Sequence, residues 1–140
     1  PPRLRRQRQM CIRDSSMDWY YPILCGIYDA DESKKIIKDK WEDFVVPGLG
    51  CKCVEEEPWV TIAETCELIL ALNKIGERKH ATNLYDDVLN LMDEKDNLFW
   101  TGFVYKDHKH WPVEKPSWTA AAVILAANSL FELNSNFDFF

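Results

Sequence analysis

The chain has 140 residues, and its 23 acidic side chains outnumber its 17 basic ones, which gives a net charge of −6. This balance argues against a protein that binds nucleic acid through bulk electrostatic attraction. Apolar residues make up 46% of the chain and aromatic residues 13%, enough for a packed core, and no low-complexity tract indicates disorder. We therefore expect one folded domain or a part of one.

Residues 1–15 are predicted to be foreign to the protein. The stretch from Met10 to Ser15 back-translates to a sequence that resembles the transposon end used in one common sequencing-library method, so we interpret residues 1–15 as adapter read-through. The alternative is a basic arm that binds nucleic acid, because arginines from Arg3 to Arg8 form a run. Without residues 1–15 the charge is 12 − 22 = −10. Residues 16–140 would then be the carboxy-terminal part of one truncated domain.

Five segments have helical patterns of two kinds. Residues 17–29, 61–75 and 118–131 are apolar on most sides of a helical wheel, which predicts buried inner helices. Residues 31–46 and 77–92 have one apolar stripe each, which predicts outer helices that face inward. Pro22 fits the first of these helices only if it lies in the first turn, where a missing N–H costs little.

The connections between these segments differ in length. Inner-to-outer turns are short, whereas the outer-to-inner links 46–57 and 93–117 are long and rich in aromatic and charged residues. Residues 98–113 alternate β-prone and turn-like stretches, so we expect a small β-hairpin-like loop there. Long links gathered at one end are typical of an α/α toroid with its active-site mouth at that end. The predicted fold is all-α: a six-hairpin-like α/α-toroid fragment with about two and a half helical hairpins.

Two motifs carry a resemblance to a known group. The turn from Asp96 to Gly102 and the Pro-Ser-Trp-Thr-Ala-Ala-Ala helix that begins at Pro116 resemble bacterial prenyltransferase-like and squalene-cyclase-like proteins of the terpenoid cyclase/protein prenyltransferase toroid superfamily. The resemblance covers residues 16–133. It implies an isoprenoid or similar apolar ligand in a central cavity, and further amino-terminal hairpins of the same chain as partners. Where protein prenyltransferases carry a zinc-binding His-Thr-Cys, this chain has Glu64, Thr65 and Cys66.

Three acids are candidate catalytic residues. Asp18, Glu64 and Glu114 lie at or near the amino-terminal ends of predicted inner helices, where the helix dipole favours an anion. Carboxylates there can protonate an alkene, act as an acid/base pair on a glycosidic bond, or bind a metal. The alternative is structural: Asp18 caps its helix, and Glu64 and Glu114 pair with Lys or Arg.

Six aromatic residues are candidate cavity-lining residues. Their rings can stabilise a carbocation, although such residues also serve as core. They are Trp19, Tyr20, Trp59, Trp100, Trp111 and Trp118.

The cysteines and histidines bear on metal binding and location. Cys51, Cys53, His108 and His110 are residue types that bind zinc, and we consider them as a site. A spacing of one residue between the two thiols is atypical for zinc, so we predict no metal, and no cofactor is evident. Free thiols on apolar helices behave as small hydrophobes and favour a reducing, cytoplasmic location. The helix at 61–75 is too short to cross a bilayer, so no transmembrane segment is predicted.

Three functions follow from these patterns. The leading hypothesis is a prenyltransferase- or terpenoid-cyclase-like enzyme. The first alternative is a carbohydrate-active α/α-toroid hydrolase or lyase that uses Glu64 with another acid. The second is a non-catalytic interaction domain with the same fold. The expected partner is a small-molecule or glycan substrate and not a nucleic acid.

Overall fold

The structure is a computed structural model that describes residues 14–133 of the chain. Within these residues it contains five α-helices and seven short strands. The helices are α2 (Ser16–Leu24), α3 (Ala30–Phe44), α4 (Ile62–Lys74), α5 (Arg78–Asn90) and α6 (Ser117–Phe131). The strands are β1 (Val45–Val46), β2 (Gly50–Cys51), β3 (Trp59–Thr61), β4 (Met92–Asp93), β5 (Leu98–Phe99), β6 (Gly102–Val104) and β7 (Lys109–His110).

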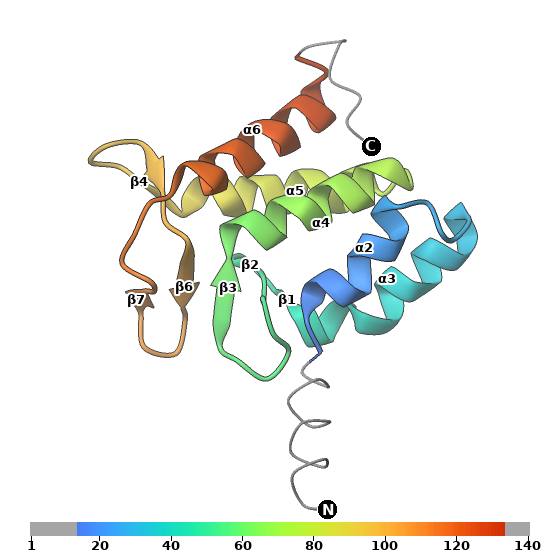
Figure 1. Ribbon diagram of the computed structural model, residues 1–140, viewed down its shortest axis with the longest axis horizontal. Helices are drawn as coiled ribbons and strands as arrows, with labels where there is room; N and C mark the ends of the chain where they lie inside the picture. Colours follow the sequence, from blue (N-terminus) through green and yellow to red (C-terminus); the bar gives the residue numbers. More distant parts are fainter. Residues whose placement is uncertain (1–13, 134–140) are drawn as a thin grey trace, which may run out of the picture.

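Helix α4 is the centre of the packing. It contacts α2, α5 and α6, and α3 packs against α2 (Figure 1). Cys66, Leu68, Ile69 and Leu72 of α4 are completely buried, because apolar residues occupy nearly every side of this helix. Gly76, with φ of +80°, follows α4 and permits the tight turn into α5. The hydrophobic core is therefore built around α4.

Three small antiparallel sheets occupy the links between the helices. Their strand orders are β1–β2, β3–β6–β7 and β4–β5. In the three-stranded sheet, Thr61 pairs with Gly102 and Phe103 pairs with His110. Figure 1 shows β3, β6 and β7 beside the amino-terminal ends of α4 and α6. This sheet positions the segment that precedes α6 against the start of α4.

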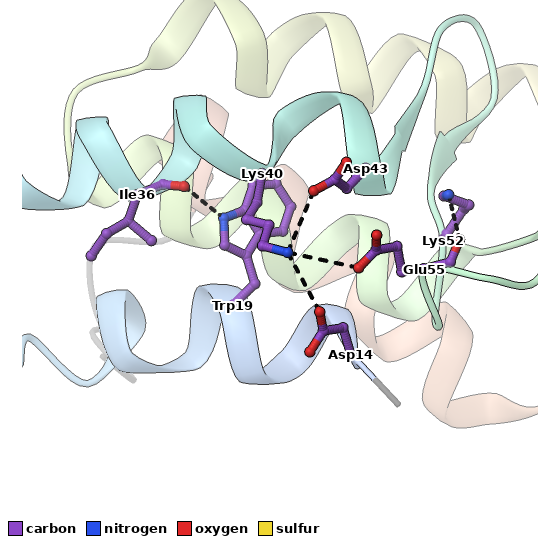
Figure 2. Close-up of polar contacts among 7 residues, drawn as sticks. All are labelled: Asp14, Trp19, Ile36, Lys40, Asp43, Lys52 and Glu55. Atoms are coloured by element: carbon purple, nitrogen blue, oxygen red, sulfur yellow. Dashed lines mark hydrogen bonds and ion pairs between the residues drawn. The ribbon is translucent and has the colours of Figure 1, made fainter. Parts of the chain in front are cut away.

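Side chains of α2 and α3 hold these two helices together (Figure 2). The Trp19 indole is buried, lies 5.3 Å from the Phe44 ring, and donates a hydrogen bond of 3.0 Å to the Ile36 carbonyl. Lys40 Nζ lies within 4.0 Å of a carboxylate oxygen of each of three acids, which belong to three separate parts of the chain. These acids are Asp14, Asp43 and Glu55, at 3.4, 3.4 and 3.7 Å.

The prediction of an all-α, α/α-toroid fold is wrong. The described residues form a mixed structure of helices and three antiparallel sheets, and no toroid is evident among them. The physical reason is that the links contain short β-prone segments, such as Val45–Val46 and Trp59–Thr61, that satisfy their backbone groups by pairing with other short strands: β1 pairs with β2, and β3 pairs with β6. Within the predicted hairpin-like loop at 98–113, β6 and β7 do pair antiparallel, whereas β5 pairs with β4 in a separate sheet.

Two helices differ from their predicted form. Helix α2 ends at Leu24, before the predicted end at residue 29, and Pro22 lies in its second turn rather than its first. Helix α6 is not buried on all sides, because Trp118, Ile124 and Phe131 are exposed while Val123, Ala126 and Leu130 are buried. The described structure leaves one apolar side of α6 open to solvent.

The start of the described chain makes ordered contacts. Ser15 is the N-cap of α2 and accepts a hydrogen bond of 3.3 Å from the Met17 amide. Residues 1–13 of the predicted adapter segment lie outside the described residues, so the boundary at residues 15 and 16 stays a prediction. Among residues 14–133, no helix is both long and apolar enough to cross a membrane.

Candidate active site

Two half-buried carboxylates on α4 form the centre of the candidate site. Glu64 and Glu67 are three residues apart, so the helical repeat places them on the same face. The residues around them in the sequence, Ala63, Thr65 and Cys66, are buried. Acids on an otherwise apolar central helix lose hydration, so they need polar partners.

Glu67 receives its partners from α2. The Tyr20 hydroxyl donates to Glu67 Oε2 at 2.5 Å, and the Tyr21 hydroxyl donates to Glu67 Oε1 at 3.1 Å. Both oxygens of one carboxylate are therefore held by neighbouring phenols. Burial, followed by the hydrogen bond to Glu67, raises the pKa of Tyr20 well above its usual range. Burial and the charge of Glu67 raise the pKa of Tyr21 to about 12.

Glu64 contacts a thiol. The Cys53 Sγ donates to Glu64 Oε1 at 3.5 Å. Burial, and then the charge of Glu64, raise the pKa of Cys53 to about 12. At neutral pH the thiol and both phenols therefore stay protonated and serve as hydrogen-bond donors to the two carboxylates. Within residues 14–133, neither Glu64 nor Glu67 forms an ion pair with Lys, Arg or His.

The other two predicted acids lie elsewhere. Asp18 is exposed in the first turn of α2. Glu114 is exposed in the segment before α6, and its Oε1 accepts a hydrogen bond of 3.1 Å from Thr101 Oγ1. No hydrogen bond joins Asp18, Glu64 and Glu114 to one another in the described part of the chain. Their catalytic roles stay predictions.

The six predicted cavity-lining aromatics occupy three environments. Trp19 and Tyr20 are buried between helices, Trp59 and Trp100 are half-buried, and Trp111 and Trp118 are exposed. The Trp100 ring stacks on the His110 ring with centroids 4.6 Å apart, and Lys115 Nζ lies 4.2 Å from the Trp100 centroid. A cavity-lining role for these residues stays a prediction.

The residues considered for zinc are separated by their contacts. Cys51 is completely buried beneath α4, whereas Cys53 contacts Glu64 and His110 stacks on Trp100. Between residues 14 and 133, no group of three His, Cys, Asp or Glu side chains is placed to hold a metal ion.

Glu67 and Tyr21 were missed as candidate site residues, and Cys53 was considered only as a zinc ligand and not as a partner of Glu64. Glu67 lies one helical turn after Glu64, and that spacing on an apolar helix is a signal that could have found it. The two phenols are 47 and 46 residues away in the sequence, so no local pattern connects them to Glu67.

Comparison with known proteins found similarity to a curated protein. No family model matches the sequence. The chain is 50% identical over 115 residues to an MMP endo-(1,4)-3-O-methyl-alpha-D-mannosidase of Mycolicibacterium hassiacum, a match that covers 82% of this chain and 32% of that protein. The chain thus spans about a third of the length of this curated relative.

This finding corrects the predicted resemblance. The relative is a glycoside hydrolase by name and not a prenyltransferase or terpenoid cyclase, so the resemblance to that superfamily and the isoprenoid function derived from it are wrong. The motifs behind that prediction were a turn and a small-residue helix, which describe backbone shape and carry no chemistry of their own. The finding favours the first alternative, a carbohydrate hydrolase.

Proposed function

We propose that this chain is part of an endo-acting glycoside hydrolase that cleaves (1,4)-linked 3-O-methyl-α-D-mannose chains. The observation that carries the proposal is the 50% identity over 115 residues to a protein with that named activity. The match covers most of the described helices and sheets, since it includes 82% of the chain. The structural alternative, an ion pair of Glu64 with Lys or Arg, has no partner residue within residues 14–133.

Glycosidic bonds are commonly hydrolysed by two carboxyl groups. One protonates the oxygen of the leaving sugar, and the other activates water or attacks the anomeric carbon. In our proposal Glu64 is the acid/base group. Glu67, held at both oxygens by Tyr20 and Tyr21, is its partner on the same face of α4. One water molecule is consumed, and the bond between the anomeric carbon and the bridging oxygen breaks.

Asp18 and Glu114 are the other candidates for the second acid. Glu114 is connected to the start of α4 through Thr101, whose carbonyl accepts a hydrogen bond of 3.1 Å from the Ile62 amide. Glu67 is favoured over both because two phenol donors fix its oxygens, and preorganised groups are the ones that act efficiently.

The test is hydrolysis by the chain expressed together with any coding sequence that flanks it in its source genome. The substrate is an oligosaccharide of (1,4)-linked 3-O-methyl-α-D-mannose. We expect Glu64→Gln and Glu67→Gln each to lower kcat by about 10²–10⁴-fold, the usual contribution of a positioned acid or base. Glu42→Gln changes an exposed acid on α3 and should leave kcat unchanged.

Three results would count against the proposal in different ways. Absence of hydrolysis by the unaltered protein would remove the function. Full activity of both glutamine variants would remove the assignment of the site. Loss of activity in Asp18→Asn or Glu114→Gln, with Glu67→Gln unaffected, would transfer the second role to that residue.

A further inference from the structure

A group of exposed apolar side chains lies between β7 and α6. Trp111 is 54% exposed and Val113 is 80% exposed, although both are large hydrophobic residues. Exposed apolar residues that occur singly need no explanation, so exposure alone does not assign Trp111 a binding role. The contacts of Trp111 with its neighbours decide whether its indole is fixed in position.

The backbone of Trp111 is fixed on both sides. Its amide donates to the Gly102 carbonyl at 3.1 Å, and its carbonyl accepts a hydrogen bond of 2.8 Å from the Trp59 indole nitrogen. The two indole rings meet edge to face, with centroids 5.1 Å apart and an interplanar angle of 73°. Trp111 is therefore an exposed ring on a rigid support.

The position of Trp59, which supports Trp111, depends on the close approach of the Trp59 ring to Gly102. Trp59 belongs to β3 and pairs with Val104 of β6. A Cβ atom on Gly102 would lie 2.4 Å from the Trp59 indole nitrogen and 2.6 Å from the Val60 carbonyl oxygen. Only glycine leaves room for the Trp59 ring to lie against β6 at this point.

The same segment is connected to the candidate active site. Glu114, three residues after Trp111, accepts a hydrogen bond of 3.2 Å at its carbonyl from the Thr101 amide. The Thr101 carbonyl in turn accepts from the amide of Ile62, two residues before Glu64. Trp111 thus lies on a loop that is joined to the amino-terminal end of α4 through Thr101. An enzyme that cuts within a glycan must hold sugar units on both sides of the cleaved bond, at a distance from its acids.

We propose that Trp111, supported by Trp59, is a stacking platform for one sugar ring of a glycan; the proposal rests on the hydrolase function given above. The C–H groups of a sugar ring carry partial positive charge and suit the negative face of an indole. A methyl ether in place of a hydroxyl makes the sugar more apolar, so a 3-O-methylmannose unit suits an exposed indole better than unmodified mannose does.

The test is a calorimetric titration with an oligosaccharide of (1,4)-linked 3-O-methyl-α-D-mannose, using the Glu64→Gln background so that the glycan stays intact. We expect Trp111→Ala to weaken binding about tenfold, the size of a well-packed aromatic contact. Trp111→Tyr keeps a ring and should retain most of the affinity. Tyr28→Ala removes an exposed aromatic residue between α2 and α3 and should change nothing.

A second measurement separates a binding role from a folding defect. The indole N–H resonance of Trp111 should shift during the titration. Trp111→Ala should still unfold in one cooperative transition, with a Tm lowered only slightly by the loss of the edge-to-face contact with Trp59. An unchanged affinity of Trp111→Ala, or no glycan binding at all, would overturn the platform. Glycan binding that depends on Trp111 without any cleavage by the unaltered protein would keep the platform and remove the hydrolase function. Cleavage that Trp111→Ala leaves unaffected would keep the hydrolase function and remove the platform.

Discussion

Glu67 is a half-buried carboxylate that, among residues 14–133, is held by two phenols and by no cation. Tyr20 is completely buried and Tyr21 is exposed, yet both donate to Glu67. The two hydrogen bonds therefore have different surroundings. A buried donor that is removed leaves its acceptor without water as a substitute, whereas an exposed one is replaced by solvent.

Tyrosine-to-phenylalanine substitutions should separate these two contacts. We expect Tyr20→Phe to lower the free energy of unfolding by about 1–3 kcal/mol, because a buried polar group loses its partner. Tyr21→Phe should lower the free energy of unfolding by less than about 0.5 kcal/mol, as is usual for surface positions. Urea denaturation of the two variants checks this, and equal effects would contradict the arrangement.

The thiols should differ in reactivity according to their surroundings. Cys25 is exposed, whereas Cys51 and Cys66 are completely buried and burial raises the pKa of both. The pKa of Cys53 is raised to about 12, so its thiolate fraction should increase about tenfold per pH unit between pH 8 and pH 10. Alkylation followed by peptide mass spectrometry should find Cys25 modified first and Cys53 increasingly at higher pH. Rapid modification of Cys51 or Cys66 in the folded protein would contradict the structure.

At the scale of elements, the β3–β6 contact depends on Gly102. A methyl group there meets the Trp59 ring and the Val60 backbone at less than 3.0 Å. We expect Gly102→Ala to lower the free energy of unfolding by about 1–3 kcal/mol, the usual cost of overpacking. It should also weaken glycan binding, because it displaces Trp59 and with it Trp111.

The matched control is a glycine with open space around it. Gly48 has φ of +78°, no atom lies within 4 Å of the place that a Cβ would take there, and asparagine tolerates that backbone conformation. Gly48→Asn should therefore change stability little and leave glycan binding intact. Thermal unfolding of both variants provides the measurement, and an unperturbed Gly102→Ala protein would show that Trp59 does not need this contact.

Lys115 joins the β4–β5 hairpin to the segment before α6. Its Nζ lies 2.7 Å from Asp93 Oδ2 and 2.7 Å from Asp96 Oδ2. The Lys115 hydrogen bond, together with backbone amides, holds the pKa of each carboxyl below its ordinary value of 3.8. Carboxyls with a lowered pKa in the folded state stabilise it above the unfolded value and lose that contribution as the pH falls through the folded value.

The pH dependence of unfolding should reveal the ion pairs of Lys115 with Asp93 and Asp96. We expect Lys115→Met to lower Tm at about pH 6, and the difference from the unaltered protein to shrink as the pH falls below 3.8. Methionine keeps an apolar chain over Trp100, so the comparison isolates the charge. Lys106→Met changes an exposed lysine and should have no such pH-dependent effect. A Tm difference that is constant from pH 6 to about pH 2 would contradict the account.

At the scale of the whole molecule, periodic patterns located most of the helices but not the architecture. The segments 31–46, 61–75 and 77–92 correspond to α3, α4 and α5, since a helix of thirteen or fifteen residues repeats its pattern several times. Strands of two residues, such as β1 and β4, are too short to show an alternating pattern. Apart from the hairpin-like loop expected at 98–113, which contains the β6–β7 pair, the strand pairing was therefore not predicted, and the links between helices were interpreted as loops of a toroid.

The candidate site was only partly accessible from the sequence for a related reason. Glu64 could be selected because it is an acid on an apolar helix. Its surroundings depend on residues distant in the chain, such as Tyr20, and on Cys53 in a link with no helical or strand pattern. The proposed function rests on the similarity to the curated mannosidase and not on sequence patterns, because the same backbone motifs occur in proteins of unrelated chemistry.

The most direct test of the central claim is the size distribution of early products from a long (1,4)-linked 3-O-methyl-α-D-mannose oligosaccharide, followed by chromatography and mass spectrometry. The chain, expressed with any coding sequence that flanks it in its source genome, is predicted to release fragments of intermediate length first, and Glu64→Gln is predicted to release almost none. Release of single sugar units from one end, or an oligosaccharide that remains intact with the unaltered protein, would contradict the claim.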